Sequence, residues 1–435
     1  MATGRSGFLA LVALSLAGVL LMSACSDDGD NGGPFSVAQA DAARNEDPAV
    51  TTDELGPLVQ GNTAFATDLY GVLSGQEGNL FFSPYSISIA LAMTSAGAAG
   101  DTATEMAGTM HFDLPQSDLH AAFNRLDLEL AARAEVESED ESAEPFELSI
   151  ANSIWAEETY EFLDPFLETL AVNYGAGARL VDFANDPEGA RETINGWVSD
   201  ETKERIPELL PQGVIDAMTR LVLTNAIFFK ASWADPFEVE ATQDGDFHLL
   251  DGSTVTAPMM RQQEGFAYAE GDGYQALELP YEGNEVAMLV ILPEEGSFEA
   301  FDASLDAEAL SSVTGALEMQ PVNVALPKFE FSTDVPLKTV LTGLGMTSAF
   351  VPGVADLSGM DGTRDLYISD ALHKAFVAVD EAGTEAAAAT AVVVGVTSAP
   401  LEPRTFEADR PFIFLIRDRI TGTILFAGRV LDPTQ

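Results

Sequence analysis

Cysteine is almost absent from this chain of 435 residues, which contains only Cys25. A single cysteine excludes an intrachain disulfide, and it leaves no set of thiolates that could hold a metal ion. The folded state must therefore be stabilised by packing. A hydrophobic content of 46% is ample for a large core, although length alone does not distinguish one large domain from two or three smaller ones.

Basic residues are also scarce, since 20 Lys and Arg face 70 Asp and Glu, which gives a formal net charge of −50. A charge of this sign repels the phosphates of nucleic acids and the anionic head groups of lipids. Nucleic acid is therefore excluded as a partner class.

Only five of the basic residues are lysine, and such an excess of carboxylates suits a surface that works in concentrated salt. Counterions screen the repulsion between like charges, and this repulsion destabilises the compact state. We expect the thermal unfolding midpoint to rise between low and molar salt, as followed by circular dichroism. A midpoint that stays constant or falls would contradict this interpretation of the acidic surface.

Recognisable catalytic motifs are missing as well. Neither an HExxH nor a GxSxG motif occurs, and Gly343 and Gly345 lack the third glycine of a dinucleotide-binding turn. The sequence therefore predicts no enzyme, no metal site and no cofactor. The histidines are scattered along the chain at His111, His120, His248 and His373.

The first 24 residues have the layout of a secretory signal peptide, with Arg5 followed by an apolar run over residues 8–22 and then by small residues. This run is shorter than the roughly 20 residues of a membrane-spanning helix. Residues 21–25, LMSAC, are similar to a bacterial lipobox, with Met22 where leucine is usual, and this implies a lipid attached to Cys25. The alternative is a lone cysteine near a conventional cleavage site.

The expected location is therefore outside the inner membrane of a bacterium, either anchored by lipid at the envelope or surface, or extracellular. The membrane would be contacted only through the lipid. Residues 25–54 are acidic, contain glycine and proline and show no sustained apolar period, so we expect a flexible linker there. A single folded domain would then occupy residues 55–435.

Helical periodicity begins at Leu55, where apolar residues recur at steps of three and four. Ser83 and Pro84 are typical of a helix start, and residues 86–99 are apolar on nearly all sides, which predicts a buried helix. A further helix is expected from Asp101, with Thr102 and Glu105 at the spacing of a capping box.

Strands are expected where apolar, β-branched and aromatic residues gather. Residues 147–155 and 221–229 are apolar on both faces, as in the middle of a sheet, and the last two strands form a hairpin with Gly422 in its turn. Helices and strands alternate irregularly, which predicts an α+β domain with several sheets. The other predicted strands are 286–292, 322–331, 375–379, 412–416 and 424–430.

An unusual segment follows at residues 380–391, DEAGTEAAAATA, which leads into VVVGVT and a tail that contains proline. Its small side chains would let an exposed loop slide between packed strands. The alanines alone would favour a helix, but Gly383, Thr384 and the valines after them favour extended structure. In a strand, Thr384 would lie on one face and Glu385 on the other, which then carries the only charge.

Five segments together resemble the serpins, a family of serine protease inhibitors, over residues 55–435. The resemblance implies an α+β fold with three β-sheets, about eight to nine helices and an exposed reactive-centre loop. The segments are 79–106, 224–237, 325–331, 368–391 and 409–433, with the sequences NLFFSPYSISIALAMTSAGAAGDTATEM, TNAIFFKASWADPF, ALPKFEF, ISDALHKAFVAVDEAGTEAAAATA and DRPFIFLIRDRITGTILFAGRVLDP.

The resemblance also implies roles for individual residues. A polar cluster, the shutter, would lie under the strands that part, and the breach would lie where the loop enters the sheet, with Lys328 facing Glu381. The hinge comprises Glu381, Gly383, Thr384, Glu385, Ala386, Ala387, Ala388 and Ala389; the shutter comprises Ser83, Ser86, Asn225 and His373; the breach comprises Trp233 and Lys328.

The implied function is inhibition of serine endopeptidases, with cysteine endopeptidases as a wider class. The inhibitor, expected to be a monomer, would trap the protease covalently as a suicide substrate while its cleaved loop inserts into the sheet. Counting 17 residues from Glu381 places the reactive bond between Thr397 and Ser398, within the interval 394–399. Small or β-branched residues there fit an elastase-like or subtilisin-like pocket, and Arg404 lies too far on for a trypsin-like target. The alternative is a non-inhibitory serpin that acts as a chaperone, carrier or surface-binding protein.

Overall fold

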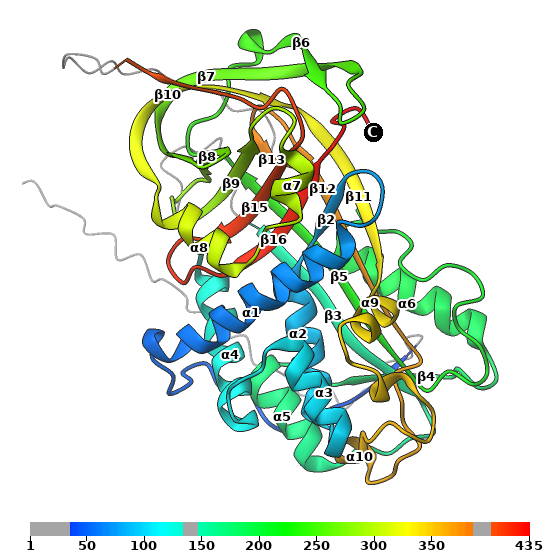
Figure 1. The fold of residues 1–435 in the computed structure, drawn as a ribbon. Helices are drawn as coiled ribbons and strands as arrows, with labels where there is room; N and C mark the ends of the chain where they lie inside the picture. The colour runs from blue at the N-terminus through cyan, green and yellow to red at the C-terminus, as the bar shows by residue number, and fades with distance from the viewer. Residues whose placement is uncertain (1–34, 134–146, 386–401) are drawn as a thin grey trace, which may run out of the picture. The chain divides into compact units, whose positions relative to one another are not determined.

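The computed structural model describes residues 35–133, 147–385 and 402–435. The described residues form ten α-helices, two short 3-10 helices and sixteen strands, in an α+β arrangement (Figure 1). The α-helices are α1 (Thr52–Leu73), α2 (Pro84–Ser95), α3 (Gly100–Met110), α4 (Gln116–Arg133), α5 (Asp164–Tyr174), α6 (Pro187–Glu201), α7 (Phe298–Asp302), α8 (Ala307–Gly315), α9 (Leu337–Gly343) and α10 (Ser358–Asp361), and the 3-10 helices are η1 (Val239–Ala241) and η2 (Ser348–Phe350).

The first sheet contains seven strands and is called here the main sheet. Its central strands are long and apolar because both of their faces are covered, as the sequence predicted for residues 147–155 and 221–229. In spatial order the strands are β1 (Ser36–Ala38), β4 (Ala178–Val181), β3 (Glu147–Glu157), β5 (Leu221–Ser232), β13 (Gly383–Thr384), β12 (Asp370–Val379) and β11 (Phe329–Pro336).

The second sheet contains nine strands, and β6 (Gln243–His248) pairs with β7 at its side. The closing hairpin that the sequence predicted is β15 and β16, and Gly422 in its turn has φ +81°. The remaining eight strands follow the order β14 (Arg404–Glu407), β10 (Glu318–Pro327), β7 (Thr254–Gly271), β8 (Tyr274–Pro280), β9 (Val286–Pro293), β15 (Phe412–Asp418), β16 (Ile424–Val430) and β2 (Leu80–Phe82).

The expected three sheets are therefore two continuous hydrogen-bonded sheets in the described residues, and the helices number ten instead of eight or nine. The sheets merge because β7 is 18 residues long: it pairs with β6 and β10 along most of its length and with β8 at its end. The single strand expected at 322–331 is also wrong. The chain leaves the second sheet after β10 and enters the main sheet as β11, with Lys328 between them.

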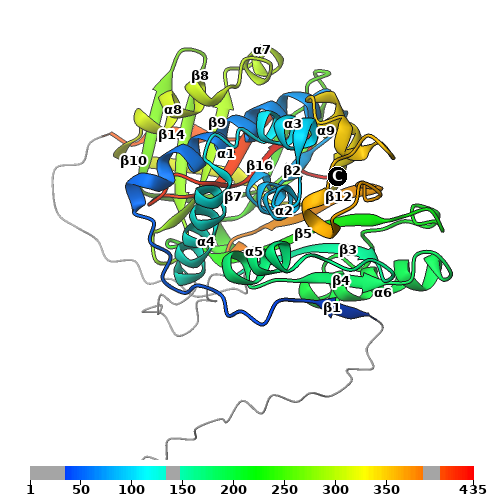
Figure 2. The same ribbon diagram turned by 90° about the horizontal axis from the view of Figure 1, so that it is seen from below.

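The buried helix predicted at Ser83 and Pro84 is present as α2, and every one of its residues is buried. It lies between the two sheets, against β3, β5 and β16 (Figure 2). Ser83 is its N-cap, because its hydroxyl accepts a hydrogen bond from the Ser86 backbone N–H at 3.1 Å. No helix among the described residues is long and apolar enough to cross a membrane.

The capping box expected at Thr102 and Glu105 does not form, since the N-cap of α3 is Ala99. Glu105 instead accepts hydrogen bonds from the backbone N–H groups of Thr347 and Ser348 at 2.8 and 2.7 Å. The Thr102 hydroxyl lies 3.2 Å from that of Ser348. Both side chains thus fix the segment around η2, which a local sequence pattern cannot indicate.

The linker expected at 25–54 is also corrected, because from residue 35 onwards the chain packs on the domain. β1 adds an antiparallel edge strand to β4 (Figure 2), and Arg44 contacts Asp127 of α4 at 2.6 Å. Helix α1 begins at Thr52, before the expected Leu55. Backbone pairing and one half-buried arginine hold this segment, so it needs no apolar periodicity. The predicted signal peptide, Cys25 and the linker up to residue 34 lie outside the described residues.

Candidate functional site

The main sheet is split at one end, and the split lies between β5 and β12. These strands pair directly, in parallel, only over residues 222–227 and 370–375. Beyond that region the two residues of β13 lie between them, with Gly383 opposite Ser232 and Thr384 opposite both Ala231 and Val379. The sheet therefore holds a wedge-shaped opening whose wide end is occupied by the first residues of the alanine-rich segment.

The fit of these two residues is close. A Cβ atom on Gly383 would lie only 2.1 Å from the Ala231 carbonyl oxygen, so the position admits only glycine without a backbone shift. Thr384 is 1% exposed, and its hydroxyl lies 2.7 Å from the Tyr281 hydroxyl. Burial raises the pKa of Tyr281, so this phenol stays neutral and can exchange a hydrogen bond with Thr384.

Trp233 forms a platform beside the hinge. Its backbone N–H donates to the Ala382 carbonyl at 2.9 Å and its indole Nε1–H donates to the Asp380 carbonyl at 3.0 Å. The indole stacks on Tyr281 with ring centroids 4.6 Å apart. The resemblance implied a place for Trp233 where the loop enters the sheet, and the structure has it against this end of the opening.

Lys328 and Glu381 meet as the family resemblance implied, with Nζ 2.6 Å from Oε2. The other carboxylate oxygen accepts a hydrogen bond from the Thr242 hydroxyl at 2.8 Å. Burial by itself raises the pKa of Glu381, but the hydrogen bonds from Lys328 and Thr242 outweigh it, and the pKa lies below its usual value. The start of the hinge is thereby fixed to the point where the chain crosses between the two sheets.

The four predicted shutter residues form one buried cluster under the narrow end of the opening. The Ser83 backbone N–H donates to His373 Nε2 at 3.1 Å, and Asn225 Nδ2 donates to the Ser86 hydroxyl at 2.7 Å. His373 Nδ1 contacts the Asn225 side-chain oxygen, which links β12 to β5 through their side chains. Because Nε2 accepts, the imidazole is the neutral tautomer with its proton on Nδ1.

Sequence reasoning missed a fifth member of the cluster, Asn152 on β3. Its side chain contacts Asn225 and lies 3.1 Å from the Ser86 hydroxyl, and it donates to the Ser86 carbonyl at 2.9 Å. Asn152, Asn225 and His373 lie in register across three adjacent strands. The available signal was a polar asparagine inside an apolar run, ELSIANSIW, at a position equivalent to the asparagine in LVLTNAIFF.

Comparison with known proteins identifies the family. The family model Serpin (serine protease inhibitor) matches residues 60–433. The chain is 41% identical to the leukocyte elastase inhibitor of Homo sapiens over 388 residues, which cover 86% of this chain and 99% of that protein. It is 42% identical over 382 residues to an uncharacterized serpin-like protein of Thermococcus kodakarensis, and these cover 87% of this chain and 86% of that protein.

The chain belongs to the serpin family. Two solved structures agree: the thermophilic serpin tengpin in its native state, with TM-score 0.78 and 28% identity, and uncleaved ovalbumin, with TM-score 0.77 and 29% identity. The matches cover 92% and 87% of this chain and 99% and 100% of theirs, respectively. Serpins are protease inhibitors and not enzymes, which confirms the prediction drawn from the missing catalytic motifs.

The serpin's described residues bring the breach, the shutter and the hinge up to Glu385 together along one seam of the main sheet. Their roles during loop insertion stay predictions. Ala386, Ala387, Ala388 and Ala389 of the hinge lie outside the described residues, as do Thr397 and Ser398 of the predicted reactive bond.

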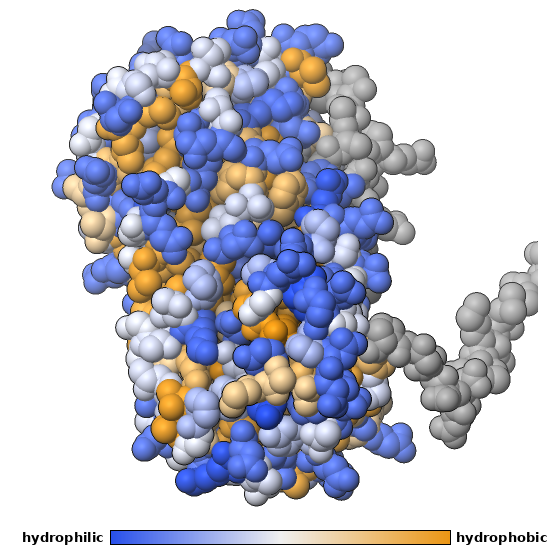
Figure 3. All heavy atoms as spheres, turned by 90° about the vertical axis from the view of Figure 1, so that its right-hand side faces the viewer, coloured by the Kyte–Doolittle hydropathy of each residue, from blue (hydrophilic) through white to orange (hydrophobic). Residues whose placement is uncertain are grey.

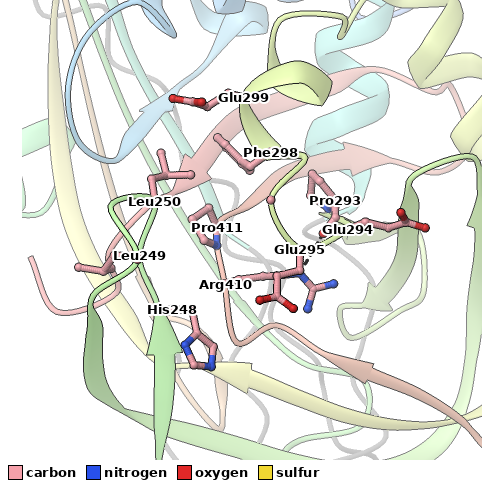
Figure 4. Close-up of a pocket in the computed structure, with 12 residues that line it drawn as sticks. His248, Leu249, Leu250, Pro293, Glu294, Glu295, Phe298, Glu299, Arg410 and Pro411 are labelled. Atoms are coloured by element: carbon pink, nitrogen blue, oxygen red, sulfur yellow. Dashed lines mark hydrogen bonds between the residues drawn. The ribbon is translucent and has the colours of Figure 1, made fainter.

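A cavity of about 290 Å³ in the serpin lies between the β6–β7 turn, the end of β9 and α7 (Figure 4). His248 and Arg410 line it together with Glu294, Glu295 and Glu299. Arg410 Nε donates to the Pro293 carbonyl at 2.9 Å, and the His248 ring lies 3.3 Å from the Thr254 hydroxyl. The described residues that line this cavity include no serine, threonine or cysteine.

Two buried histidines of this serpin make its stability sensitive to acid. Burial lowers the pKa of His373 to about 3 and that of His120 to about 4. Both are neutral in the folded state, so they do not lower the free energy of unfolding at pH values above about 6.5, the pKa of a histidine in the unfolded chain. Below it the unfolded chain binds protons that the folded chain refuses, and each histidine lowers the free energy of unfolding by up to about 1.4 kcal/mol per pH unit.

We therefore expect the thermal midpoint to fall as the pH is lowered from 7 to 5, and to fall less in His120→Gln. The exposed His248→Gln provides the matched control and should follow the parent protein. Differential scanning calorimetry at half-unit pH steps measures the three curves. Parallel curves for the parent protein and His120→Gln would show that His120 does not contribute.

Proposed function

We propose that this serpin inhibits serine proteases by covalent trapping, in which the cleaved loop inserts into the main sheet. The observation that carries the proposal is the register of β13, because Gly383 and Thr384 already lie antiparallel to both β5 and β12. They occupy the first two positions of a strand that the opening could extend. The similarity to leukocyte elastase inhibitors, at 41% identity, supports the same function.

Extension of this register makes the proposed insertion specific. Gly383 faces Ser232 of β5, and Thr384 faces Val379 of β12. In an antiparallel register, each residue further along the loop would pair with the preceding residue of both neighbouring strands. Thr390 would then lie opposite Asn225 and opposite His373 at the same time. Its hydroxyl would enter the shutter between the two side chains that now contact each other, so the polar cluster could exchange one hydrogen-bond partner for another.

The proposed mechanism leaves all covalent chemistry to the protease. Its serine attacks the loop carbonyl, the peptide bond breaks, and the new amino terminus leaves with the proton from the serine, which gives an acyl-enzyme. Insertion of the freed loop then carries the acyl-enzyme along the sheet before water can attack. Displacement of the oxyanion from its hydrogen-bond donors slows deacylation, because those donors contribute several kcal/mol to the transition state.

We propose an elastase-like or subtilisin-like protease as the target, and a reactive bond at Thr397 and Ser398, or elsewhere between residues 394 and 399. Small and β-branched residues in this interval support this specificity. We also propose that the leader is removed and that Cys25 carries a lipid. Mass spectrometry of the exported protein tests the lipid, since an N-terminus without an acyl mass at Cys25 would contradict it.

The inhibition is tested with purified protein and equimolar elastase, subtilisin and chymotrypsin. A covalent adduct that survives boiling in detergent is expected with at least one of them. Mass spectrometry of the small released peptide then locates the reactive bond. Quantitative cleavage by every protease without an adduct would overturn the proposal and would favour a carrier or chaperone role.

A further inference from the structure

Glu385 is the last hinge residue that the structure describes before residue 402, and its side chain is buried on an unusual backbone. Its φ of +54° lies in the left-handed region, which costs a residue with a side chain about 1 kcal/mol. Its N–H donates to the Ala378 carbonyl at 2.9 Å, so the residue still pairs with β12 while the chain turns away from the strand direction. The carboxylate side chain is only 3% exposed.

The buried carboxylate is poorly compensated. Arg205, in the segment after α6, places Nε 3.1 Å from Oε2, yet neither carboxylate oxygen accepts a well-aligned hydrogen bond. The Arg205 side chain is 52% exposed, so water screens its charge. Two further charges act on the carboxylate: the positive charge of Lys230 on β5 and the negative charge of Glu330 on β11. From β12 the neutral ring of Phe376 lies under the Arg205 guanidinium.

We propose that Glu385 makes docking of the hinge respond to protonation: the neutral side chain keeps Gly383 and Thr384 between β5 and β12, and the ionised side chain drives them out. This inference rests on the proposed function and adds a regulation to it. In the docked hinge an ionised carboxylate would be buried without adequate hydrogen bonds, whereas in the released hinge water would solvate it. Protonation therefore favours docking.

The size of the effect follows from linkage. The pKa of Glu385 rises from 4.5 for a free side chain to about 7 in the docked hinge, chiefly because the side chain is buried. The negative charge of Glu330 also raises this pKa, whereas the positive charges of Arg205 and Lys230 lower it. A raised pKa means that the stabilisation is complete below pH 4.5 and is lost as the pH rises through 7. Between pH 6 and pH 8 the docking equilibrium constant should fall about tenfold.

The experiment measures hydrogen exchange of the hinge amides in the uncleaved protein, with no protease present. The amide of Glu385 exchanges slowly only while the hinge is docked, because its acceptor is the Ala378 carbonyl. Protection factors at pH 6 and pH 8, each relative to the intrinsic exchange rate, give the ratio that matters. Amides of the β15–β16 hairpin, in the second sheet, control for any change in global stability.

In the parent protein the protection of the hinge should fall about tenfold from pH 6 to pH 8. Glu385→Gln should abolish this fall and keep the hinge docked at pH 8. If the glutamine variant folds poorly, Glu385→Ala replaces it, and the same result is expected. Arg205→Gln should increase the fall, because it removes a charge that favours the ionised form. Because each ratio compares one variant with itself, packing changes cancel.

A hinge with equal protection at both pH values in the parent protein would overturn the inference, as would an unchanged tenfold fall in Glu385→Gln. Neither result depends on inhibition of a protease. A protein that gives no covalent adduct could still show the exchange response, and an effective inhibitor could lack it. The two proposals therefore fail separately.

Discussion

Cleavage of the serpin at any bond between Val394 and Ala399 is expected to raise its thermal unfolding midpoint by more than about 10 °C, which for a chain of this size corresponds to at least several kcal/mol. The physical reason is the opening between β5 and β12. Among the described residues Gly383 and Thr384 form the strand in it and Glu385 adds one backbone hydrogen bond to β12, while direct pairing of β5 and β12 is limited to six positions at the other end. A cut loop is free to continue this ladder.

Insertion would satisfy backbone groups on both sides of the new strand, and it would bury the methyl groups of the alanines on its inner face. Calorimetry of the protein before and after nicking measures the change, with the nick located by mass spectrometry. A cut outside the loop serves as the control and should leave the midpoint equal or lower. If the loop-nicked protein melts at the same temperature as the intact one, the main sheet stores no conformational energy and the proposed mechanism fails.

The central strands could be predicted from the sequence because burial on both faces leaves a strong local signal. The runs at 147–155 and 221–229 became β3 and β5, whereas the polar cluster beneath the sheet was predicted from the family resemblance and without Asn152. The position of β13 depends on tertiary structure and not on a local sequence signal. Two residues form a strand there only because β5 and β12 diverge and leave room, and no local pattern encodes that divergence.

Other misses share this dependence on tertiary contacts. Residues 35–51 look like a linker because a strand of three residues and one arginine clamp produce no apolar period. The change of sheet at Lys328 falls within the segment VNVALPKFEF, where the alternation of apolar residues continues on both sides of the crossing. Glu385 was expected on the exposed face of an inserted strand, yet it is buried because the backbone turns at that residue.

The surface of the described residues carries both hydrophilic and apolar side chains (Figure 3). On the face drawn in Figure 3, hydrophilic side chains surround several apolar patches. Individual large apolar residues are exposed among the described residues, with Met218 at 68% and Met319 at 69%. Scattered apolar exposure of this kind is ordinary for a folded protein and indicates no docking site by itself.

Substitution Thr384→Arg is expected to convert the serpin from an inhibitor into a substrate. Thr384 is 1% exposed and its hydroxyl contacts that of Tyr281, so the arginine would have to leave the sheet or bury an unpaired charge. Burying such a charge costs several kcal/mol. Each 1.4 kcal/mol changes the competition between insertion and hydrolysis about tenfold, so the ratio of trapped to merely cleaved serpin should fall by at least about 100-fold.

Thr384→Ser is the matched control, because it keeps the hydroxyl that contacts Tyr281 and removes only a methyl group; it should trap the protease nearly as well as the parent. Titration of a fixed amount of protease gives the number of serpin molecules consumed per adduct for all three proteins. The nicked Thr384→Arg protein should also lack the rise in melting temperature. If Thr384→Arg formed adducts at the parental ratio, trapping would not require residue 384 to enter the sheet, and the register of β13 would have no part in the mechanism.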